Sequence, residues 1–514
     1  MIEFKIKFFK GNVNMQNKEK EVMIDLIENQ LKNSGISRRD AIRMMGASSA
    51  AALMMGGTSV QANEEATKHT ATHSEDHIVI VGGGAGGIMM AARMNRAAPK
   101  AKITIIAPNE VHLYQPGQVF MAAGLYTLDD IKNDNKSLIP SGVDWIKDKV
   151  TEYDPDNNSV KTAKGKTVKY DYLIVAAGIS YQYEQIEGLT EDMIGKHGIS
   201  SVYLNNPEKG TADGGIETAK WFVEMRKAAE KASKEKPITV LCTQPNTPIK
   251  CGGAPQKIMY LSDDNLRGNG PTGGKDVHMN AKFYFTKAGK GLFGIKEYAK
   301  TLSDEVQPMY GNIENKWKHN LVKIDGPNKI ATYEVTTVTK GEYDEDLEEY
   351  EMIENKSLVD IKYDFIHVVP PMTASNEFKN SKLAWQKGSG KGWMELDKDT
   401  MQHRRYKNVF GIGDIAGIPK GKTGGTARHQ AAVIEDNLVA VMNSKKPEHK
   451  FDGYTVCPLK TQYGEILMAE FNYGKSPAPS FPLLDPSVPR KVWWIFDLYI
   501  LKTMYWQLMM RGIM

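Results

Sequence analysis

The chain has 514 residues, a length that allows two or three domains and excludes a single small module. Its formal net charge of +4 is small for this length, so the composition does not favour a nucleic-acid-binding surface, which would need a concentrated basic stripe. Three cysteines are too few for a disulfide scaffold and show no zinc-ligand spacing, and we therefore expect no metal site.

An export signal is predicted at the N-terminus. The sequence SRRDAIR is followed by an uncharged run of small residues that ends with VQA at Ala62. A charged region, an apolar region and a small-residue cleavage site in this order indicate a signal peptide, and the paired arginines indicate the twin-arginine type. The alternative is a helix that begins with two arginines. The 36 residues before this segment are long for such a signal, which makes Met15 and Met23 candidate start positions. We expect a signal at residues 1–62, a polar linker at 63–76, and a mature protein on the periplasmic side of the cytoplasmic membrane.

A dinucleotide-binding pattern opens the folded part of the chain. An apolar strand at residues 77–81 runs into a glycine loop, a helical stretch follows, and residues 102–106 form the next strand. The glycines have the spacing G-x-G-x-x-G, at Gly82, Gly84 and Gly87. The first permits a tight turn, the second lets a pyrophosphate approach the backbone, and the third lets helix and strand pack closely. The helix that starts at Ala85 offers its N–H groups to the phosphates.

The acidic residue that usually binds the ribose is missing from this pattern. Ala107 stands at the end of the second strand, within ITIIAPNE. Asn109 and Glu110 are the two candidates for the ribose contact, and Asn109 is included in the predicted cofactor site.

Two later segments favour a flavin over a nicotinamide. The strand in YDYLIVAAGI ends in a small-residue turn that contains Ala177 and Gly178. The segment NVFGIGDIAGIPKGKTGG presents Asp414 after a strand and next to Gly413. An aspartate at such a turn can hydrogen-bond a ribityl chain, which nicotinamide cofactors lack.

These segments resemble the later contact segments of the flavoprotein disulfide reductase superfamily. The resemblance implies FAD as the cofactor. It places Gly413 and Asp414 near the ribityl phosphate region, and Lys422 and Thr423 near the isoalloxazine. NEVHLYQPGQVF lacks the cysteine with which some flavocytochrome relatives attach FAD, so we expect non-covalent binding.

Alternating strands and helices predict parallel, doubly wound sheets. Further strands are expected at residues 170–178, 237–242, 281–286, 330–338 and 364–371. A second G-x-G-x-x-G, at Gly289, Gly291 and Gly294, follows the second strand of the second domain and not the first. The loop after the first strand is CTQPNTPIKCGGAPQK, so we do not expect electrons to arrive as hydride from NAD(P)H.

Several motifs, PIKCGGAPQK, HVVPPM, GIGDIAGIPKGKTGG and VPRKVWWIFDLYILKTMYWQLMMRG, together resemble the sulfide:quinone oxidoreductases from about His77 to the C-terminus. The resemblance implies that Cys251 and Cys457 form a disulfide or polysulfur bridge beside the flavin. Sulfide attacks a disulfide by thiol exchange, and the departing thiolate can donate to the flavin. Lys250 and Lys257 flank Cys251 and are expected to hold its thiolate form. A small buried apolar residue is the alternative for each cysteine.

The remaining cysteine and the histidines receive structural roles. Cys242 ends an apolar strand. Many relatives carry a third redox cysteine in an earlier segment, where GISSVYLNN offers Tyr203 instead. Three histidines fall in motifs near the expected site and are interpreted as structural: His112, His197 and His367.

An interfacial membrane segment is predicted at residues 490–514. The part from 492 to 510 holds six aromatic residues, and Asp497 and Lys502 are its only charges. These two charges make spanning costly, whereas the aromatic residues and flanking basic residues suit a helix in the membrane interface. A buried helix or a dimer contact is the alternative. A quinone dissolved in the bilayer, ubiquinone or menaquinone, fits as acceptor, and a homo-oligomer is compatible with this segment.

We therefore expect an α/β fold with two Rossmann-like domains. An FAD-binding domain is formed by residues 77–195 and 366–445, and the second domain by 196–365, without a functional NAD loop. Residues 446–514 carry the second redox cysteine and the amphipathic membrane-binding segment.

The leading hypothesis is an FAD-dependent sulfide:quinone oxidoreductase that forms zero-valent sulfur or polysulfide. One alternative is a flavocytochrome c-type sulfide dehydrogenase flavoprotein that donates to a c-type cytochrome. Another is a non-catalytic flavin-binding sensor or docking protein, with the eight acidic residues between 342 and 354 as its partner surface. That acidic run is otherwise interpreted as a solvated hairpin or loop.

Overall fold

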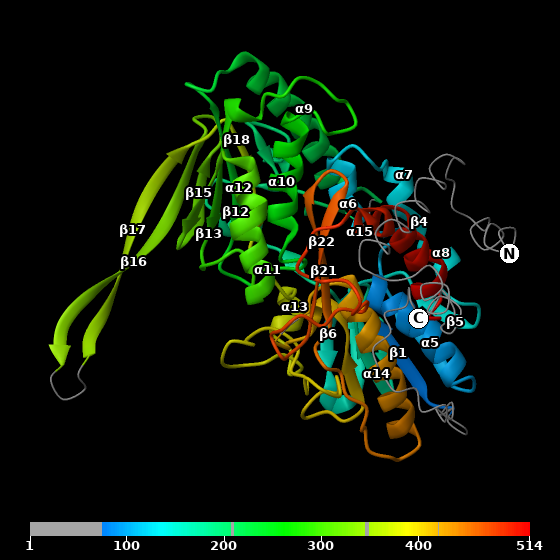
Figure 1. Ribbon diagram of the computed structural model, residues 1–514. Helices are drawn as coiled ribbons and strands as arrows, with labels where there is room; N and C mark the ends of the chain where they lie inside the picture. The colour runs from blue at the N-terminus through cyan, green and yellow to red at the C-terminus, as the bar shows by residue number, and fades with distance from the viewer. Residues whose placement is uncertain (1–74, 207–209, 345–348, 420) are drawn as a thin grey trace, which may run out of the picture.

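The computed structural model describes residues 75–206, 210–344, 349–419 and 421–514. Two domains, each built on a five-stranded parallel sheet, lie next to each other, and the C-terminal helical segment packs against the first of them (Figure 1). The α/β class with two Rossmann-like domains is confirmed. The predicted export signal lies outside the described residues.

The sheet of the first domain consists of short, almost entirely apolar strands, and most of their residues are buried. Its strand order is β20 (Val409–Gly411), β9 (Tyr172–Val175), β1 (His77–Val81), β2 (Lys102–Ile106) and β5 (Val143–Ile146). The main helices are α5 (Ala85–Ala97) and α14 (Gly424–Met442), which pack together. β1 and α14 lie some 350 positions apart, so two distant parts of the chain meet in this domain.

Smaller elements surround this sheet. The strands are β3 (Val111–Leu113), β4 (Lys132–Asp134), β6 (Val150–Asp154), β7 (Ser159–Thr162) and β8 (Thr167–Lys169). The helices are α6 (Gly117–Ala122), α7 (Leu128–Ile131), α8 (Asn135–Leu138) and α13 (Asn376–Lys379). A two-stranded antiparallel ladder of β10 (Ser180–Tyr181) and β19 (Met372–Thr373) joins the chain segments that pass between the domains.

The sheet of the second domain is also parallel throughout. Its order is β11 (Ile199–Ser200), β18 (Phe365–His367), β12 (Ile238–Gln244), β13 (Ala281–Lys287) and β14 (Ile313–Trp317). Its helices are α9 (Asp213–Lys231), α10 (Ala254–Leu266), α11 (Lys296–Thr301) and α12 (Gln307–Tyr310). β18 extends across the predicted domain boundary at residue 365.

A long antiparallel hairpin projects from the second domain (Figure 1). β15 (His319–Asp325), β16 (Ile330–Asp344) and β17 (Glu349–Lys362) form a separate three-stranded sheet. The prediction that residues 330–338 belong to a parallel sheet is wrong, because β16 pairs antiparallel with β17. Ala331 and Tyr333 are buried while their neighbours are more exposed, and this alternation is typical of a half-buried antiparallel strand. The described part of the acidic run, residues 342–344 and 349–354, lies at the end of β16 and the start of β17.

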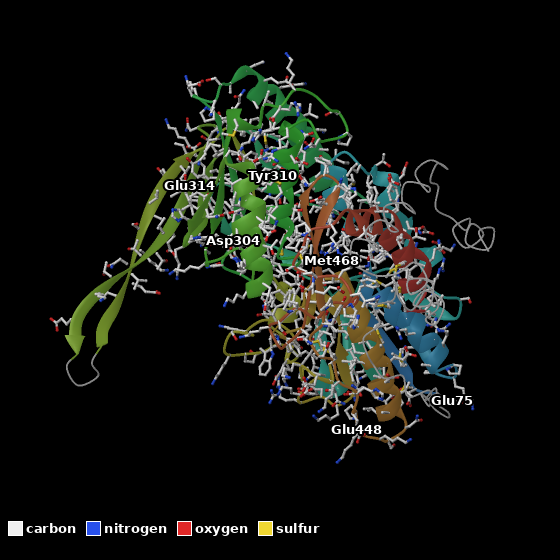
Figure 2. All side chains as sticks on the ribbon, in the orientation of Figure 1. Glu75, Asp304, Tyr310, Glu314, Glu448 and Met468 are labelled. Carbon is white, nitrogen blue, oxygen red and sulfur yellow. The ribbon has the colours of Figure 1, made fainter. Side chains whose placement is uncertain are left out.

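The C-terminal region starts with a hairpin between the two domains. It consists of β21 (Thr455–Gln462) and β22 (Glu465–Phe471), and Figure 2 labels Met468 of β22 at the level where the domains meet. Short helical turns follow: α15 (Lys491–Ile495), η7 (Phe496–Leu501), α16 (Lys502–Met504) and η8 (Tyr505–Met509). Among the described residues, no helix combines the length and the apolar character needed to cross a membrane.

Candidate active site

The two predicted redox cysteines meet at the junction of the domains. Cys251 lies in the loop between β12 and α10, and Cys457 lies on β21. Both are free thiols, and their side chains hydrogen-bond each other. As whole residues, Cys251 is half-buried and Cys457 is buried. Cys251 has φ +49°, a left-handed conformation that is uncommon for a residue with a side chain and occurs often at functional sites.

Gly253, the residue before α10, permits this close approach. A Cβ atom at Gly253 would lie 2.4 Å from Cδ2 of Leu459 and 2.7 Å from Sγ of Cys457. The next glycine, Gly252, has no heavy atom within 4 Å of the corresponding position. Glycine is therefore required at residue 253, because α10 begins at the next residue and the sulfur of Cys457 leaves no room for a side chain here.

One of the two predicted lysines contacts the Cys251 sulfur. Nζ of Lys257, which is 3% exposed, donates to Sγ of Cys251 at 3.1 Å. The hydrogen bond from Cys457 and the charge of Lys257 hold the pKa of the Cys251 thiol well below its usual value, although burial opposes this. Burial also acts to lower the pKa of Lys257, but the two sulfurs outweigh it and raise that pKa.

Lys250 takes another role in the loop. Its Nζ binds the hydroxyl of Tyr181 and the side-chain oxygen of Gln115, so it turns away from the cysteine sulfur. Tyr203 donates from its hydroxyl to the carbonyl oxygens of Lys250 at 3.2 Å and of Cys251 at 3.4 Å. The backbone of the cysteine loop is thus held by a phenol.

A buried ion pair lies behind the cysteines. Lys460 on β21 binds Asp497 of the C-terminal segment, and both side chains are almost fully buried. Nζ of Lys460 also lies 4.5 Å from the ring centre of Phe120. Burial lowers the pKa of Lys460, and Asp497 opposes this by keeping a negative charge next to it. No sequence pattern points to Lys460, and the sequence identifies Asp497 only as a charge that makes membrane spanning costly.

The glycine loop after β1 forms an open cradle for a phosphate group. Gly82 has φ +115°, and a Cβ there would meet the Ala176 carbonyl oxygen at 2.3 Å, while a Cβ at Gly87 would meet the Gly82 carbonyl oxygen at 1.8 Å. Gly84 has no heavy atom within 4 Å of its Cβ position. The first turn of α5, which starts at Ala85, has no side-chain cap and no acidic residue. Its N–H groups therefore remain for an anionic ligand.

The other predicted cofactor residues lie at the same edge of the sheet, where the strands end. Ala177 and Gly178 follow β9, and Gly413 and Asp414 follow β20. Cβ positions at Gly178 and Gly413 meet no heavy atom within 4 Å, and Ala177 is exposed. Burial raises the pKa of the Asp414 carboxyl. These residues and the α5 cradle fit an extended dinucleotide.

Lys422 and Thr423 lie at the start of α14. Thr423 is the N-cap, and its hydroxyl accepts from the backbone N–H of Thr426 at 3.2 Å. Lys422 donates to the Ala416 carbonyl at 3.1 Å, and its Nζ lies 3.7 Å from the ring centre of Trp393. Burial lowers the pKa of Lys422 to about 8.

Two buried amides, missed by the sequence reasoning, hold the cofactor loops. Nδ2 of Asn135 donates to the carbonyl oxygens of Gly83 at 3.3 Å and of Asn109 at 2.7 Å. Oε1 of Gln430 accepts from the backbone N–H of Gly413 at 2.8 Å, while its buried Nε2 has no partner in the described chain. Asn109 donates to the Gly83 carbonyl at 3.3 Å, so it lies at the loop, and its ribose contact stays a prediction.

The structure places the remaining cysteine and two of the histidines in the packed interior. Cys242 is fully buried in β12, and burial raises the pKa of its thiol. His367 is buried on β18 and accepts from the backbone N–H of Val202 at 3.1 Å. His112 binds Oδ1 of Asn135 at 3.0 Å and the Tyr505 hydroxyl.

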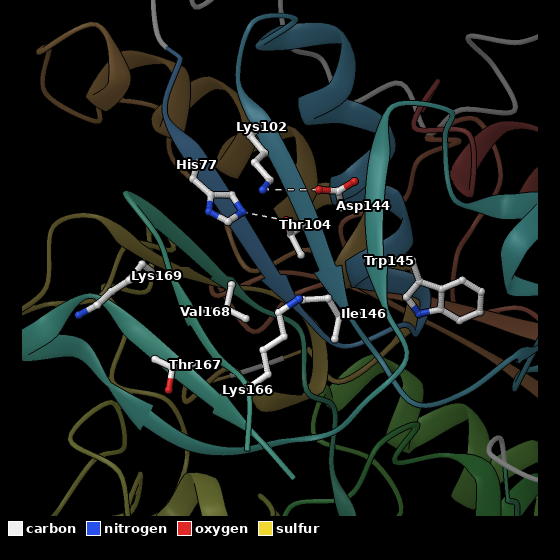
Figure 3. A pocket seen from close by; sticks show the side chains of 10 residues that line it. All are labelled: His77, Lys102, Thr104, Asp144, Trp145, Ile146, Lys166, Thr167, Val168 and Lys169. Carbon is white, nitrogen blue, oxygen red and sulfur yellow. Dashed lines mark hydrogen bonds and ion pairs between the residues drawn. The ribbon is translucent and has the colours of Figure 1, made fainter. Parts of the chain in front are cut away.

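Two cavities lie outside this thiol pair. One of 450 Å³ lies at the opposite edge of the first sheet, where His77 and Lys102 begin β1 and β2 (Figure 3). The other, of 390 Å³, lies beside the cysteine loop and is lined by Thr247, Met372 and Trp393 among others. The backbone N–H of Met372 donates to the Thr247 hydroxyl at 3.0 Å, which closes one wall of this second cavity.

Comparisons with known proteins extend this picture. The family model for pyridine nucleotide-disulphide oxidoreductases matches residues 76–211. The mitochondrial sulfide:quinone oxidoreductase of Mus musculus is 35% identical over 425 residues, which cover 83% of this chain and 84% of the relative. The mitochondrial enzyme of the same name from Dictyostelium discoideum is 35% identical over 413 residues, 80% of this chain and 81% of the relative. The X-ray structure of the sulfide:quinone oxidoreductase from Aquifex aeolicus matches with a TM-score of 0.65 at 21% identity, and the match covers 85% of this chain and 92% of that one.

The two parallel sheets, the open glycine cradle and the family model define an FAD-dependent oxidoreductase. Its cofactor is FAD, and the residues around α5, β9 and β20 fit that group. The two curated relatives match along most of their length, so the chain belongs to the sulfide:quinone oxidoreductase family. The resemblance found in the sequence is confirmed.

Proposed function

We propose that the chain oxidises sulfide at Cys251 and Cys457 and reduces a membrane quinone. The observation that carries this proposal is the thiol pair itself, with Lys257 bound to only one of its sulfurs. A two-cysteine centre cycles between a dithiol and a disulfide, and the two sulfurs become chemically unequal when a cation binds one of them. The two relatives named above carry sulfide and quinone in their names.

The first step is a thiol exchange with a defined direction. In the oxidised pair, hydrosulfide attacks Sγ of Cys457, a new sulfur–sulfur bond forms there, and the bond to Cys251 breaks. Cys251 leaves as a thiolate, because the low-pKa thiol is the better leaving group and Lys257 neutralises its charge. Cys457 then carries the added sulfur as a persulfide.

The second step restores the disulfide and releases the electrons. FAD, when bound, accepts two electrons from the sulfur centre and passes them to the quinone. A second hydrosulfide attacks the outer sulfur of the Cys457 persulfide, the bond between that sulfur and Cys457 breaks, and the two sulfurs leave as hydrodisulfide while Cys457 returns to a thiol. The Cys251–Cys457 bond then re-forms from the Cys251 thiolate and the Cys457 thiol with the loss of one proton and two electrons, which are the electrons that FAD would take up. The N–H groups at the start of α5, with Gly82 and Gly84, would hold the phosphates of this FAD, and Asp414 would bind its ribityl chain.

A sulfide titration tests the proposal. Sulfide added to the anaerobic holoenzyme should bleach the flavin absorbance, and decylubiquinone should restore it. Cys251→Ser and Cys457→Ser should each lose the bleaching, whereas Cys242→Ser, which alters a thiol inside β12, should retain it. Undiminished bleaching in Cys251→Ser would contradict the assignment, and reduction of cytochrome c in place of quinone would favour a flavocytochrome.

The proposal includes the place of action. The C-terminal segment is expected to lie in the membrane interface, with Lys460 and Asp130 binding its charges, Asp497 and Lys502, on the protein side. Export by the twin-arginine route and a periplasmic position follow from the sequence pattern at residues 37–62. Residues 1–62 fused to a reporter that must fold in the cytoplasm, before export, would test the twin-arginine route.

A further inference from the structure

The ion pair of Lys460 and Asp497 lies next to the redox cysteines and is more deeply buried than the ion pair that Lys502 of the same segment makes with Asp130. Lys460 is three residues from Cys457 on the same strand, and Asp497 comes from the C-terminal segment. Their side chains are 3% and 2% exposed. Two charges removed from water to this extent carry a large desolvation cost, so such a pair needs a reason other than stability.

The charges around Cys251 show what the pair contributes. Lys257 binds the sulfur directly, and Lys460 supplies a second positive charge that acts on the same sulfur. Asp497 acts on both lysines. Two ammonium groups, one carboxylate and one thiolate sum to zero, so this buried cluster is balanced only when Cys251 is ionised.

Asp497 is needed for Lys460 to remain charged. Burial lowers the pKa of Lys460, and Asp497 is the anion that opposes this loss of the proton. Without the carboxylate, a buried ammonium lowers its energy by becoming neutral. The charge that reaches Cys251 from β21 therefore depends on a residue of the C-terminal segment, 40 positions after the second cysteine.

We propose that Lys460 and Asp497 are positioning residues that hold a second ammonium charge at Cys251, so that the C-terminal segment completes the electrostatic site of the leaving thiolate. The inference rests on the proposed function, because it assigns these residues to the same thiol exchange. The charged and titratable groups that face Cys251 from the elements packed around it are Lys257 on α10, Cys457 and Lys460 on β21, Tyr203 after β11 and Asp414 after β20.

Alkylation of the reduced holoenzyme measures the thiolate directly. The enzyme is reduced, freed of reductant, and treated with iodoacetamide over a range of pH values, and the modified Cys251 peptide is quantified by mass spectrometry. Lys460→Met should move the midpoint of Cys251 alkylation upward by about one pH unit, which is roughly a tenfold loss of rate below the midpoint. Asp497→Asn should move it in the same direction, and Lys460→Arg should retain the wild-type midpoint.

A double variant separates charge from packing. Lys460→Met/Asp497→Leu replaces the pair by apolar side chains, which restores a packed interior but not the charge. A raised midpoint in this variant supports the proposal, and a wild-type midpoint overturns it by showing a structural role. If Lys460→Met does not fold, the double variant and Lys460→Arg carry the test. Lys502→Met, which breaks the ion pair of the same segment with Asp130, should leave the midpoint unchanged.

Failure of this inference is distinguishable from failure of the proposed function. If sulfide bleaches the wild-type flavin but the midpoint of Cys251 alkylation is unshifted in the folded variants, only the role of Lys460 and Asp497 is overturned. If sulfide does not bleach the flavin of the wild-type enzyme but the variants still shift the midpoint of Cys251 alkylation, the proposed reaction is overturned. The electrostatic role of the pair then remains intact.

Discussion

The backbone N–H of Cys251 donates to the carbonyl oxygen of Lys422 at 2.9 Å. This hydrogen bond joins the cysteine loop of the second domain to the segment of the first domain that is expected beside the isoalloxazine. The loop of the redox cysteine is thus attached to the flavin-binding domain through the main chain, and its position depends on both domains.

Removing FAD should loosen this attachment. The segment from Gly413 to Thr423 is expected to lose its ligand, and the Cys251 amide should then exchange its hydrogen faster. Hydrogen exchange of the holoenzyme and the apoenzyme, read by mass spectrometry on a peptide that covers Cys251, measures this. A peptide from β16 and β17 is the internal control, and equal exchange of the Cys251 peptide in both forms would contradict the expected coupling.

Lys257→Met should weaken the leaving thiolate. The variant removes the ammonium that lies 3.1 Å from Sγ of Cys251, so the pKa of that thiol rises. We expect sulfide-dependent flavin reduction, followed by stopped-flow absorbance near neutral pH, to slow by roughly tenfold or more. Lys323→Met, which breaks an exposed ion pair with Glu187 on the second domain, is the matched control and should reduce flavin at the wild-type rate.

Gly253→Ala should destabilise the protein and separate the sulfurs. The added Cβ would overlap with Leu459 and Cys457, and overpacking of this kind costs about 1–3 kcal/mol. Gly252→Ala adds the same atom one residue earlier, where no heavy atom lies within 4 Å. Urea unfolding should show the loss for Gly253→Ala and a much smaller change for Gly252→Ala, and equal midpoints would contradict the packing described at α10.

Outward-facing apolar residues of the C-terminal segment should control membrane binding. Ile500 is half-buried and Ile513 is 59% exposed. Replacing each by serine should cost about 1.4 kcal/mol, or roughly tenfold in affinity for lipid vesicles in a sedimentation assay. Flavin bleaching by sulfide should persist, because neither residue touches the cysteines. Val338→Ser on the hairpin is the control, and a loss of bleaching would mean that the substitutions disturb the redox site.

His112 should make the protein acid-sensitive in a defined pH window. Burial lowers the pKa of His112 to about 4, whereas an unfolded histidine has a pKa of about 6.5. The folded state therefore binds fewer protons between these values, and the stability that is present above about pH 6.5 is lost as the pH falls toward 4. Between about pH 7.5 and 5, wild type should lose about 2 kcal/mol more than His112→Gln in urea unfolding. Parallel losses in the two proteins would contradict the assignment.

The sequence was sufficient to predict the sheets and the cofactor edge. Short apolar strands followed by glycines have few other interpretations, so β1, β12 and β13 were placed within two residues of their observed ends. The strand at 330–338 was assigned to the wrong kind of sheet, because local composition does not reveal the direction of the partner strand. The pairing of Cys251 with Cys457 came from family resemblance and not from spacing.

Buried polar residues were the part that the sequence could not provide. A lysine in a short strand next to polar residues is usually solvent-exposed, and Lys460 lies in such a stretch, CPLKTQ. It is buried because β21 is covered on one side by α10 and because the C-terminal segment brings Asp497 to it. Gln430 gave no signal either, since a glutamine within a helix resembles any exposed helical residue.

The contacts of the C-terminal segment determine when this protein can first become active during its synthesis. Tyr505 binds His112, which was synthesised 393 positions earlier, and Asp497 joins a site whose first cysteine lies in the middle of the chain. Contacts of such long sequence separation form late in folding. A nascent chain still held by the ribosome up to residue 505 lacks both of them. The ribosome-bound protein is therefore expected to remain without a working redox centre until its last residues are released.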